Sequence, residues 1–483
     1  MNLPLRLKLI ALGSALAAVW LGALLAEEAY ALPFLVLAAA VVGLLVTLLR
    51  TTPGAIILGL GLFGYLVGNR GFAQFMPVPA VPLLPAELIL LLTGGGLVLS
   101  SAVSRRLPLQ RDGLNVMVIA WLAVGTARIA FDVHTFGLLA LRDYAMTYYA
   151  LFFFLAQQLA QDARSRRFLV AALGAACLVQ PLAVVLSSSF PVFFLTQLVV
   201  RGVPLIYFKG DLAMTFMGVS AVVLAAGAPA ALRLWVWPLA TLELVGVISG
   251  ENRASMLGAG LALAWLAVSR LRRFALVQAA TVLLALLVVA GGALLTDNVW
   301  AQQRMEGVTG RILSLTDLVG QGPATSPESA MKSDNNRFRT MWWRAVASET
   351  LAQNPAFGLG FGYDLARGFL QEYSPDLTEE FTARSPHSIL MSAFGRLGFT
   401  GLAVFAGFCG VLAVRTWRVM RDPAAAPLAL GLWSSLWVIL LSACFGVVLE
   451  GPMGAVVFWT LLGLANAPSP AADETDSPAV PAG

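Results

Sequence analysis

Long apolar runs recur along this whole chain and limit the folds that it can adopt. Fourteen runs are close to the length that a membrane crossing requires, and those at 54–68, 254–269 and 452–467 are the shortest. A bilayer offers no water to unpaired backbone groups, so such segments must be helical. The pattern predicts an all-α, polytopic membrane protein with about 12–14 transmembrane helices. The runs lie at residues 8–26, 31–49, 54–68, 83–103, 113–130, 143–160, 168–187, 211–229, 232–249, 254–269, 274–295, 388–414, 426–447 and 452–467.

The composition supports a membrane protein and excludes several other classes. Apolar residues make up 59% of the chain and charged residues only 12%, about half the share in soluble domains. The net charge of +5 is small and unevenly placed, so we expect no nucleic-acid partner. The three cysteines all fall inside apolar runs without metal-ligand spacing, which indicates packing residues. Met1–Ala26 has some features of a signal peptide, but its length and the further runs favour an uncleaved first span.

Basic residues are shared unequally between the two sets of loops that connect the runs. Sixteen Arg and Lys residues lie on one side and five on the other, so the positive-inside rule places both termini in the cytoplasm. The inner set is Arg6, Lys8, Arg50, Arg105, Arg106, Arg111, Arg164, Arg166, Arg167, Arg233, Arg270, Arg272, Arg273, Arg415, Arg418 and Arg421. The outer set is Arg70, Arg142, Arg201, Lys209 and Arg253.

This topology divides the chain into four parts. Residues 1–295 form the N-terminal transmembrane helices, 296–386 an outer, periplasmic segment, 387–467 the C-terminal transmembrane helices, and 468–483 a disordered cytoplasmic tail. Within the outer segment, residues 302–333 show no helical period. Apolar spacing predicts a helix at 336–353, and a second, short helix is expected at 365–373.

His387, one of two histidines, lies where the outer segment meets an apolar run. Ser385 is predicted to cap the following helix, with Pro386 as its first residue, and Arg384 stands just before them. The positive end of a helix disfavours a cation, so the imidazole should stay neutral and able to accept a proton. The other histidine, His134, is expected to be interfacial.

Arginines on the outer face suggest an anion-binding site. Arg253 follows a tight connection, and three more arginines lie on the predicted outer helix, where Arg337 and Arg344 share a face and Arg339 points elsewhere. A solvated basic face is the simpler explanation of that helix. Guanidinium groups at headgroup height can also bind phosphate in bidentate fashion, and a neutral base beside them can activate a hydroxyl. Such a site suits attack on a sugar attached to a lipid diphosphate.

Other residues give weaker signals. Glu243 lies inside an apolar run, where a carboxylate is costly, and it can organise Arg253 from below. Arg201, with Lys209 and Asp211, is a candidate to line a lipid entrance. The glycine-rich turn at 357–362 does not follow a strand, so we expect a close backbone approach there rather than dinucleotide binding.

Several of these motifs together resemble the O-antigen ligase superfamily of bacterial membrane glycosyltransferases. The resemblance covers residues 245–465, and residues 1–244 are similar only in hydropathy. Its motifs, in order, are Asn252-Arg253-Ala254-Ser255, Arg339-Thr340-Met341-Trp342-Trp343, Asn354-Pro355-Ala356-Phe357-Gly358-Leu359-Gly360-Phe361-Gly362, and Ser385-Pro386-His387-Ser388 with Gly395, Gly398 and Gly401.

The resemblance implies a reaction and a set of site residues. It implies an undecaprenyl-diphosphate-linked glycan as donor, a lipid- or glycan-bound acceptor such as lipid A-core, and transfer at the periplasmic face of the bacterial inner membrane without metal or other cofactor. The family's histidine corresponds to His387, which would act as the base, and its loop arginine corresponds to Arg253. Its second arginine corresponds to Arg339 with Trp343, or to Arg337 in the alternative register. A single displacement would invert the anomeric carbon.

Two alternatives remain open from the sequence. A polysaccharide polymerase would use the same site, with a second lipid-linked glycan as acceptor. A secondary transporter or flippase would place charged residues near the bilayer midplane, where Glu243 is the best candidate. Glu27 and Glu28 lie in a first outer loop of only a few residues, which disfavours a glycosyltransferase with acidic catalytic residues there.

Overall fold

A computed structural model describes seven stretches of the chain, and their helical content agrees with the predicted class. The stretches are residues 31–76, 83–104, 109–228, 230–250, 252–295, 327–373 and 384–468. The expected first span at 8–26, most of 302–333 and the tail from 469 onward lie outside the described residues.

The N-terminal half of the described chain consists of helices and one short hairpin. β1 and β2 are antiparallel, with Val199 opposite Pro204. The elements are α2 (Ala31–Leu49), α3 (Pro53–Val67), α4 (Arg70–Gln74), α5 (Pro85–Ile89), the π-helix η1 (Leu90–Gly94), α6 (Gly95–Ser104), α7 (Gly113–Phe136), α8 (Leu138–Tyr148), α9 (Leu151–Leu159), α10 (Ala163–Ser189), the π-helix η2 (Phe193–Gln197), β1 (Val199–Val200), β2 (Val203–Pro204) and α11 (Gly210–Gly227).

In the C-terminal half every secondary-structure element of the described residues is a helix. Its elements are the 3-10 helix η3 (Ala230–Leu232), α12 (Arg233–Ser249), α13 (Arg253–Ala267), α14 (Arg272–Leu295), α16 (Pro327–Gln353), α17 (Arg367–Tyr373), α18 (Ile389–Arg421), α19 (Pro427–Cys444) and α20 (Pro452–Asn466).

Helix length and apolarity confirm a polytopic helical membrane protein. Among the described residues, six helices are individually long and apolar enough to cross a bilayer. Two further pairs could each form one span with a bend, of 113° between α2 and α3 and of 41° between α8 and α9. The short runs expected at 254–269 and 452–467 are also helical, as α13 and α20. The six long helices are α7, α10, α11, α14, α18 and α19.

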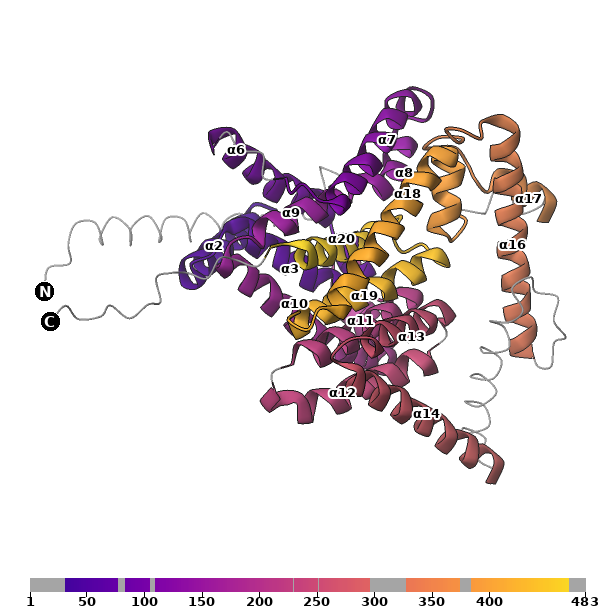
Figure 1. Cartoon of the computed structure of the whole chain (residues 1–483). Coiled ribbons are helices and arrows are strands. Elements are labelled where there is room, and N and C mark those ends of the chain that lie inside the picture. The colour runs from indigo at the N-terminus through magenta and orange to yellow at the C-terminus, as the bar shows by residue number, and fades with distance from the viewer. Residues whose placement is uncertain are drawn as a thin grey trace, which may run out of the picture.

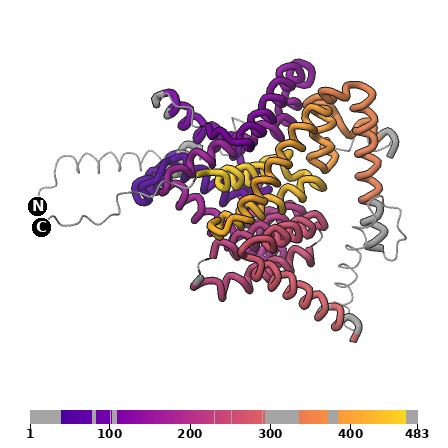
Figure 2. Tube along the Cα trace, in the orientation of Figure 1, coloured from indigo at the N-terminus to yellow at the C-terminus, as the bar shows by residue number. Residues whose placement is uncertain are grey.

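The C-terminal helices pack between the two groups of earlier helices, as Figure 2 shows by colour. α18 packs against α7 and α20 against α9, while α19 contacts both α11 and α13. Small residues allow the closest approach: a Cβ added at Gly258 of α13 would lie 2.8 Å from the backbone oxygen of Val438 in α19. Such contacts are typical of helix packing in membranes, where close backbone approach stabilises the interface.

The outer segment forms a small helical unit beside the bundle (Figure 1). α16 packs against both α17 and α18, around a separate apolar cluster that includes Trp342, Val346 and Phe369. α16 begins at Pro327, nine residues before the predicted start. The prediction of no helix before residue 334 is therefore wrong for these residues, because the polar turns from Pro327 carry no apolar face to mark them. Pro327 in the first turn, with Glu328 beside it, suits a helix start.

The glycine-rich turn connects this outer unit to the membrane helices by backbone hydrogen bonds. The N–H groups of Leu359 and Gly360 donate to the carbonyl oxygens of Gly395 and Arg396, at 2.7 and 3.1 Å. Gly360 has a φ of +94°, and a Cβ there would overlap the carboxylate of Asp132 in α7. The predicted close backbone approach is thus confirmed, and it places the end of α16 against the start of α18.

Candidate functional site

His387 lies in a turn before α18 and not within that helix. Ser388 caps α18 and accepts a hydrogen bond from the N–H of Met391 at 3.5 Å. His387 itself has a φ of +54°, in the left-handed region. The prediction that Ser385 caps the helix and Pro386 starts it is therefore wrong, because a left-handed residue interrupts a right-handed helix. Strained backbone of this kind is common at functional sites.

Two tryptophans of α16 fix the position of His387. The indole N–H of Trp343 donates to the carbonyl oxygen of Pro386 at 2.7 Å. The Trp342 ring meets the imidazole edge-on, with 5.7 Å between ring centroids, and its own N–H donates to the carbonyl oxygen of Leu365 at 2.7 Å. Trp343 was expected near the site only from its spacing to Arg339. The structure shows that it holds the backbone beside the imidazole.

The imidazole of His387 lies among charged groups from two other segments. Burial lowers the pKa of His387 to about 4, and the charges of Arg339 and Lys209 act in the same direction, while Asp211 opposes them. The ring is therefore neutral at pH 7, as expected. The cause is burial and neighbouring cations, not the end of a helix.

Arg253 and Arg339 lie close enough to influence one another. Burial lowers the pKa of Arg339, the charge of Arg253 lowers it further, and Asp211 raises it. Arg253 donates from Nη2 to Oδ1 of Asn336, one helical turn before Arg339, at 2.8 Å. The start of α13 thus meets the face of α16 that turns toward His387.

The polar connection before α13 also fixes the start of α11. Asn252 caps α13, accepting from the N–H of Ala254 at 2.9 Å, and donates from Nδ2 to the carbonyl oxygen of Asp211 at 2.8 Å. The carboxylate of Asp211 pairs with Lys209 at 3.1 Å. We call Lys209, Arg253 and Arg339 the cationic group. It contains three positive side chains, and the carboxylate of Asp211 lies beside it.

The other predicted residues are placed differently. Arg337 is exposed on α16, as is Arg344, so Arg339 is the arginine that faces the site. Arg201 lies in the tight turn of the β1–β2 hairpin. Glu243 is buried in α12, and neither of its oxygens accepts a hydrogen bond from a described residue. Among the described residues, Glu243 therefore makes no hydrogen bond that could support Arg253.

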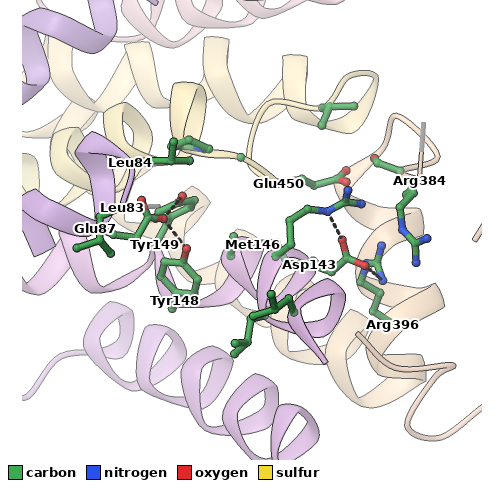
Figure 3. A pocket seen from close by; sticks show the side chains of 18 of the residues that line it. Leu83, Leu84, Glu87, Asp143, Met146, Tyr148, Tyr149, Arg384, Arg396 and Glu450 are labelled. Atoms are coloured by element: carbon green, nitrogen blue, oxygen red, sulfur yellow. Dashed lines mark hydrogen bonds and ion pairs between the residues drawn. The ribbon is translucent and has the colours of Figure 1, made fainter. Parts of the chain in front are cut away.

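A cavity of about 760 Å³ opens beside His387. Figure 3 shows polar side chains gathered at two opposite ends of it. Arg384, Arg396, Asp143 and Glu450 form the near end, next to His387, and Glu87 with Tyr148 and Tyr149 forms the far end. Of these, only Arg384 was a predicted site residue. Sequence reasoning missed the far end because its residues belong to two apolar runs that are about 60 positions apart.

The near end of the cavity is a set of paired charges. Arg396, which had no partner in the sequence, donates to Asp143 at 2.9 Å, and both side chains are more than nine-tenths buried. Arg142 pairs with the same carboxylate at 3.3 Å. Arg384 donates to the carbonyl oxygen of Gly362. Burial raises the pKa of Glu450, although Arg396 and nearby hydroxyl groups oppose the shift.

No group of three or more His, Cys, Asp or Glu side chains in the described stretches is arranged to hold a metal ion. Two of the charged groups that act on His387, Arg339 and Lys209, are cations and can hold an anionic substrate.

Taken together, the spans and the buried polar site define a multi-pass membrane protein with a polar cavity beside His387. Residues 238–406 match the family model for O-antigen ligase, and this region contains Arg253, Arg339, the glycine-rich turn and His387. This match, over about a third of the chain, supports membership of the O-antigen ligase superfamily of ligase- or polymerase-like membrane enzymes. A comparison with curated proteins found no match to this chain.

Proposed function

We propose that this protein is a periplasm-facing glycosyltransferase of the bacterial inner membrane, of the O-antigen ligase type. It moves a glycan from undecaprenyl diphosphate to a hydroxyl of an acceptor such as lipid A-core. The observation that carries the proposal is the neutral imidazole of His387, which lines an open cavity and is close enough to Arg339 and Lys209 for their charges to lower its pKa. A base and an anion site in contact are what transfer from a lipid diphosphate requires.

The reaction is a single displacement. His387 accepts the proton of the acceptor hydroxyl while that oxygen forms a bond to the anomeric carbon of the donor sugar. The bond from this carbon to the diphosphate oxygen breaks, and its electron pair leaves with the lipid diphosphate. Lys209, Arg253 and Arg339 stabilise the charge that develops on the leaving group. Attack from the opposite face inverts the anomeric configuration.

Charge placement supports the assignment of Arg339 over Arg337. Arg339 lowers the pKa of His387, which requires that the two groups be close, whereas Arg337 is exposed on another face of α16. A diphosphate held by Arg339 would therefore lie beside the imidazole.

The test is turnover by the purified protein in liposomes that contain undecaprenyl-diphosphate-linked glycan and lipid A-core. We expect release of lipid diphosphate that depends on the acceptor. Arg339→Gln should raise the donor KM about tenfold or more, because charge-assisted hydrogen bonds are lost. Arg337→Gln, on the same helix, is the matched control and should change it less than about twofold.

Product size then separates the two enzyme types. One glycan added to each lipid A-core indicates a ligase, and a ladder built on lipid-linked glycan indicates a polymerase that uses the same groups. Movement of the donor across the bilayer without release of lipid diphosphate would instead favour a transporter and overturn the proposal.

A further inference from the structure

The cavity beside His387 differs in charge from the cationic group, which also acts on the imidazole. Three basic side chains line it, Arg142, Arg384 and Arg396, and three carboxylates balance them, Glu87, Asp143 and Glu450. The cationic group has three basic side chains, and among the described residues Asp211 is the carboxylate that acts on both Arg339 and His387. A diphosphate therefore suits the cationic group, and a neutral ligand suits the cavity.

The far end of the cavity has the chemistry of a hydroxyl-binding site. The hydroxyl groups of Tyr148 and Tyr149 both donate to Oε1 of Glu87, at 2.6 and 2.7 Å. Oε2 of Glu87 makes no hydrogen bond with a described residue. One carboxylate oxygen is thus held in place by two phenols, while the other remains an acceptor for a ligand O–H. Tyrosine rings also offer an apolar face beside a polar group, as a sugar requires.

The walls and the size of the cavity fit the same kind of ligand. Met146 lies between the two polar ends and Leu83 and Leu84 lie beside Glu87 (Figure 3), and Leu138 and Leu141 also line the cavity. A volume of about 760 Å³ lies within the range of small-molecule sites, which is roughly 300–1,000 Å³. Apolar walls with a few fixed polar groups bind a sugar by its faces and its hydroxyls together.

The residues that line the cavity come from two parts of the chain, one inside and one outside the region that the family model matches. His387, Arg384 and Arg396 belong to the region that matches the O-antigen ligase family, residues 238–406. Glu87, Tyr148 and Tyr149 lie outside it. The proposed base thus lies in the region that the family model matches, while the groups at the far end come from a part of the chain that the model does not cover.

We propose that this cavity binds a sugar of the acceptor, and that Glu87, held by Tyr148 and Tyr149, recognises hydroxyl groups on it. This proposal rests on the proposed function only in assigning the bound sugar to the acceptor. The acceptor hydroxyl reaches His387 from the cavity, and the donor diphosphate reaches it from the side of the cationic group. The three far-end residues are specificity-determining and do not touch the reacting atoms.

Equilibrium binding to the purified protein in detergent tests the proposal without any turnover. One titration uses lipid A-core and the other uses undecaprenyl diphosphate. Glu87→Gln and Tyr148→Phe should each weaken lipid A-core binding about tenfold, because hydrogen bonds to a buried charged group are lost. Both should leave binding of undecaprenyl diphosphate within about twofold, and Arg339→Gln should do the reverse.

Tyr144→Phe is the matched control for Tyr148→Phe. Tyr144 lies on the same helix, its hydroxyl bonds to Thr126 at 2.6 Å, and it does not line the cavity. This variant should bind both ligands as the wild type does. A lipid-linked glycan replaces lipid A-core as the probe if the wild type binds only the former.

Each remaining outcome decides the question. Weaker binding of undecaprenyl diphosphate in Glu87→Gln would assign the cavity to the donor and overturn the proposal. Unchanged binding of both acceptor probes in Glu87→Gln and Tyr148→Phe would show that the far end recognises neither. If the wild type shows no transfer but Glu87→Gln and Tyr148→Phe still weaken acceptor binding, the sugar site is supported and the proposed reaction is rejected.

Discussion

The pKa of His387 determines how the activity depends on pH. The charges of Arg339 and Lys209 add to burial in lowering it to about 4, so the imidazole stays neutral until the pH falls to that value. We expect kcat/KM, which reports the free enzyme, to fall only as the pH drops through about 4. Lys209→Met should move this acid limb upward, because one nearby positive charge is removed.

The pH–rate profile of the wild type and of Lys209→Met checks this expectation. The donor concentration is varied at each pH, since Lys209 also belongs to the cationic group. An acid limb near 6.5 in the wild type, or a downward shift in the variant, is incompatible with this electrostatic account.

Residue identity was predicted better than residue environment. His387, Arg253 and Arg339 were chosen from the sequence, and the structure brings them together with Lys209 and Asp211. The choice between Arg337 and Arg339 could not be made from spacing, because both registers of α16 were open until its contact with His387 was known. The left-handed backbone at His387 was missed because Ser-Pro before a histidine is also the pattern of a helix start.

The indole of Trp343 connects α16 to the turn that carries His387. Trp343→Phe removes the hydrogen bond to the Pro386 carbonyl oxygen and retains an aromatic ring. Displacement of a catalytic group by less than 1 Å is costly, so we expect kcat to fall about tenfold with the donor KM unchanged. Trp437→Phe removes a comparable indole bond, to Thr416, away from the site and should leave kcat unaltered.

This kinetic split distinguishes positioning from folding. Equal losses in both tryptophan variants, or a change in donor KM alone, would show that Trp343 does not position the imidazole.

The glycine-rich turn makes the outer unit depend on backbone contact. In Gly360→Ala, the added Cβ would overlap the carboxylate of Asp132, and a φ of +94° is unfavourable for alanine. We expect a cost of about 1–3 kcal/mol, seen as a lower melting temperature in detergent. Gly410 in α18 has open space around it, and Gly410→Ala should raise the melting temperature slightly. A Gly360→Ala protein as stable as the wild type would contradict the close approach.

The apolar runs predicted where the helices lie, but they did not always predict where a helix begins or ends. Each apolar run in the described stretches corresponds to a helix or a bent pair of helices. The early turns of α16 were not predicted, because polar residues such as Lys332 and Asp334 give no periodic signal to a helix that stands outside the membrane.

The packing of the C-terminal helices between earlier ones determines the cavity at the scale of the whole molecule. Glu450 lies about 300 positions after Tyr148 and still further from Glu87. The packing of α20 against α9 and of α18 against α7 helps to bring these segments together. A single sequence contains no signal for such contacts, which explains why the cavity could not be predicted.

Topology gives a prediction at the same scale. Ser348 on α16 and Ala424 after α18 are both exposed and lie on opposite sides in the predicted orientation. In a background in which Cys177, Cys409 and Cys444 are alanine, Ser348→Cys should react with an impermeant maleimide added to intact spheroplasts. Ala424→Cys should react only after the membrane is opened. The reverse pattern of labelling would place the site in the cytoplasm.

The most direct test of the central claim is acceptor-dependent release of lipid diphosphate by His387→Ala in proteoliposomes. General-base catalysis contributes typically about 10²–10⁴-fold, so we predict a loss of that size, with binding of undecaprenyl diphosphate retained through the cationic group. A His387→Ala protein that transfers glycan at the wild-type rate would contradict the assignment of His387 as the base.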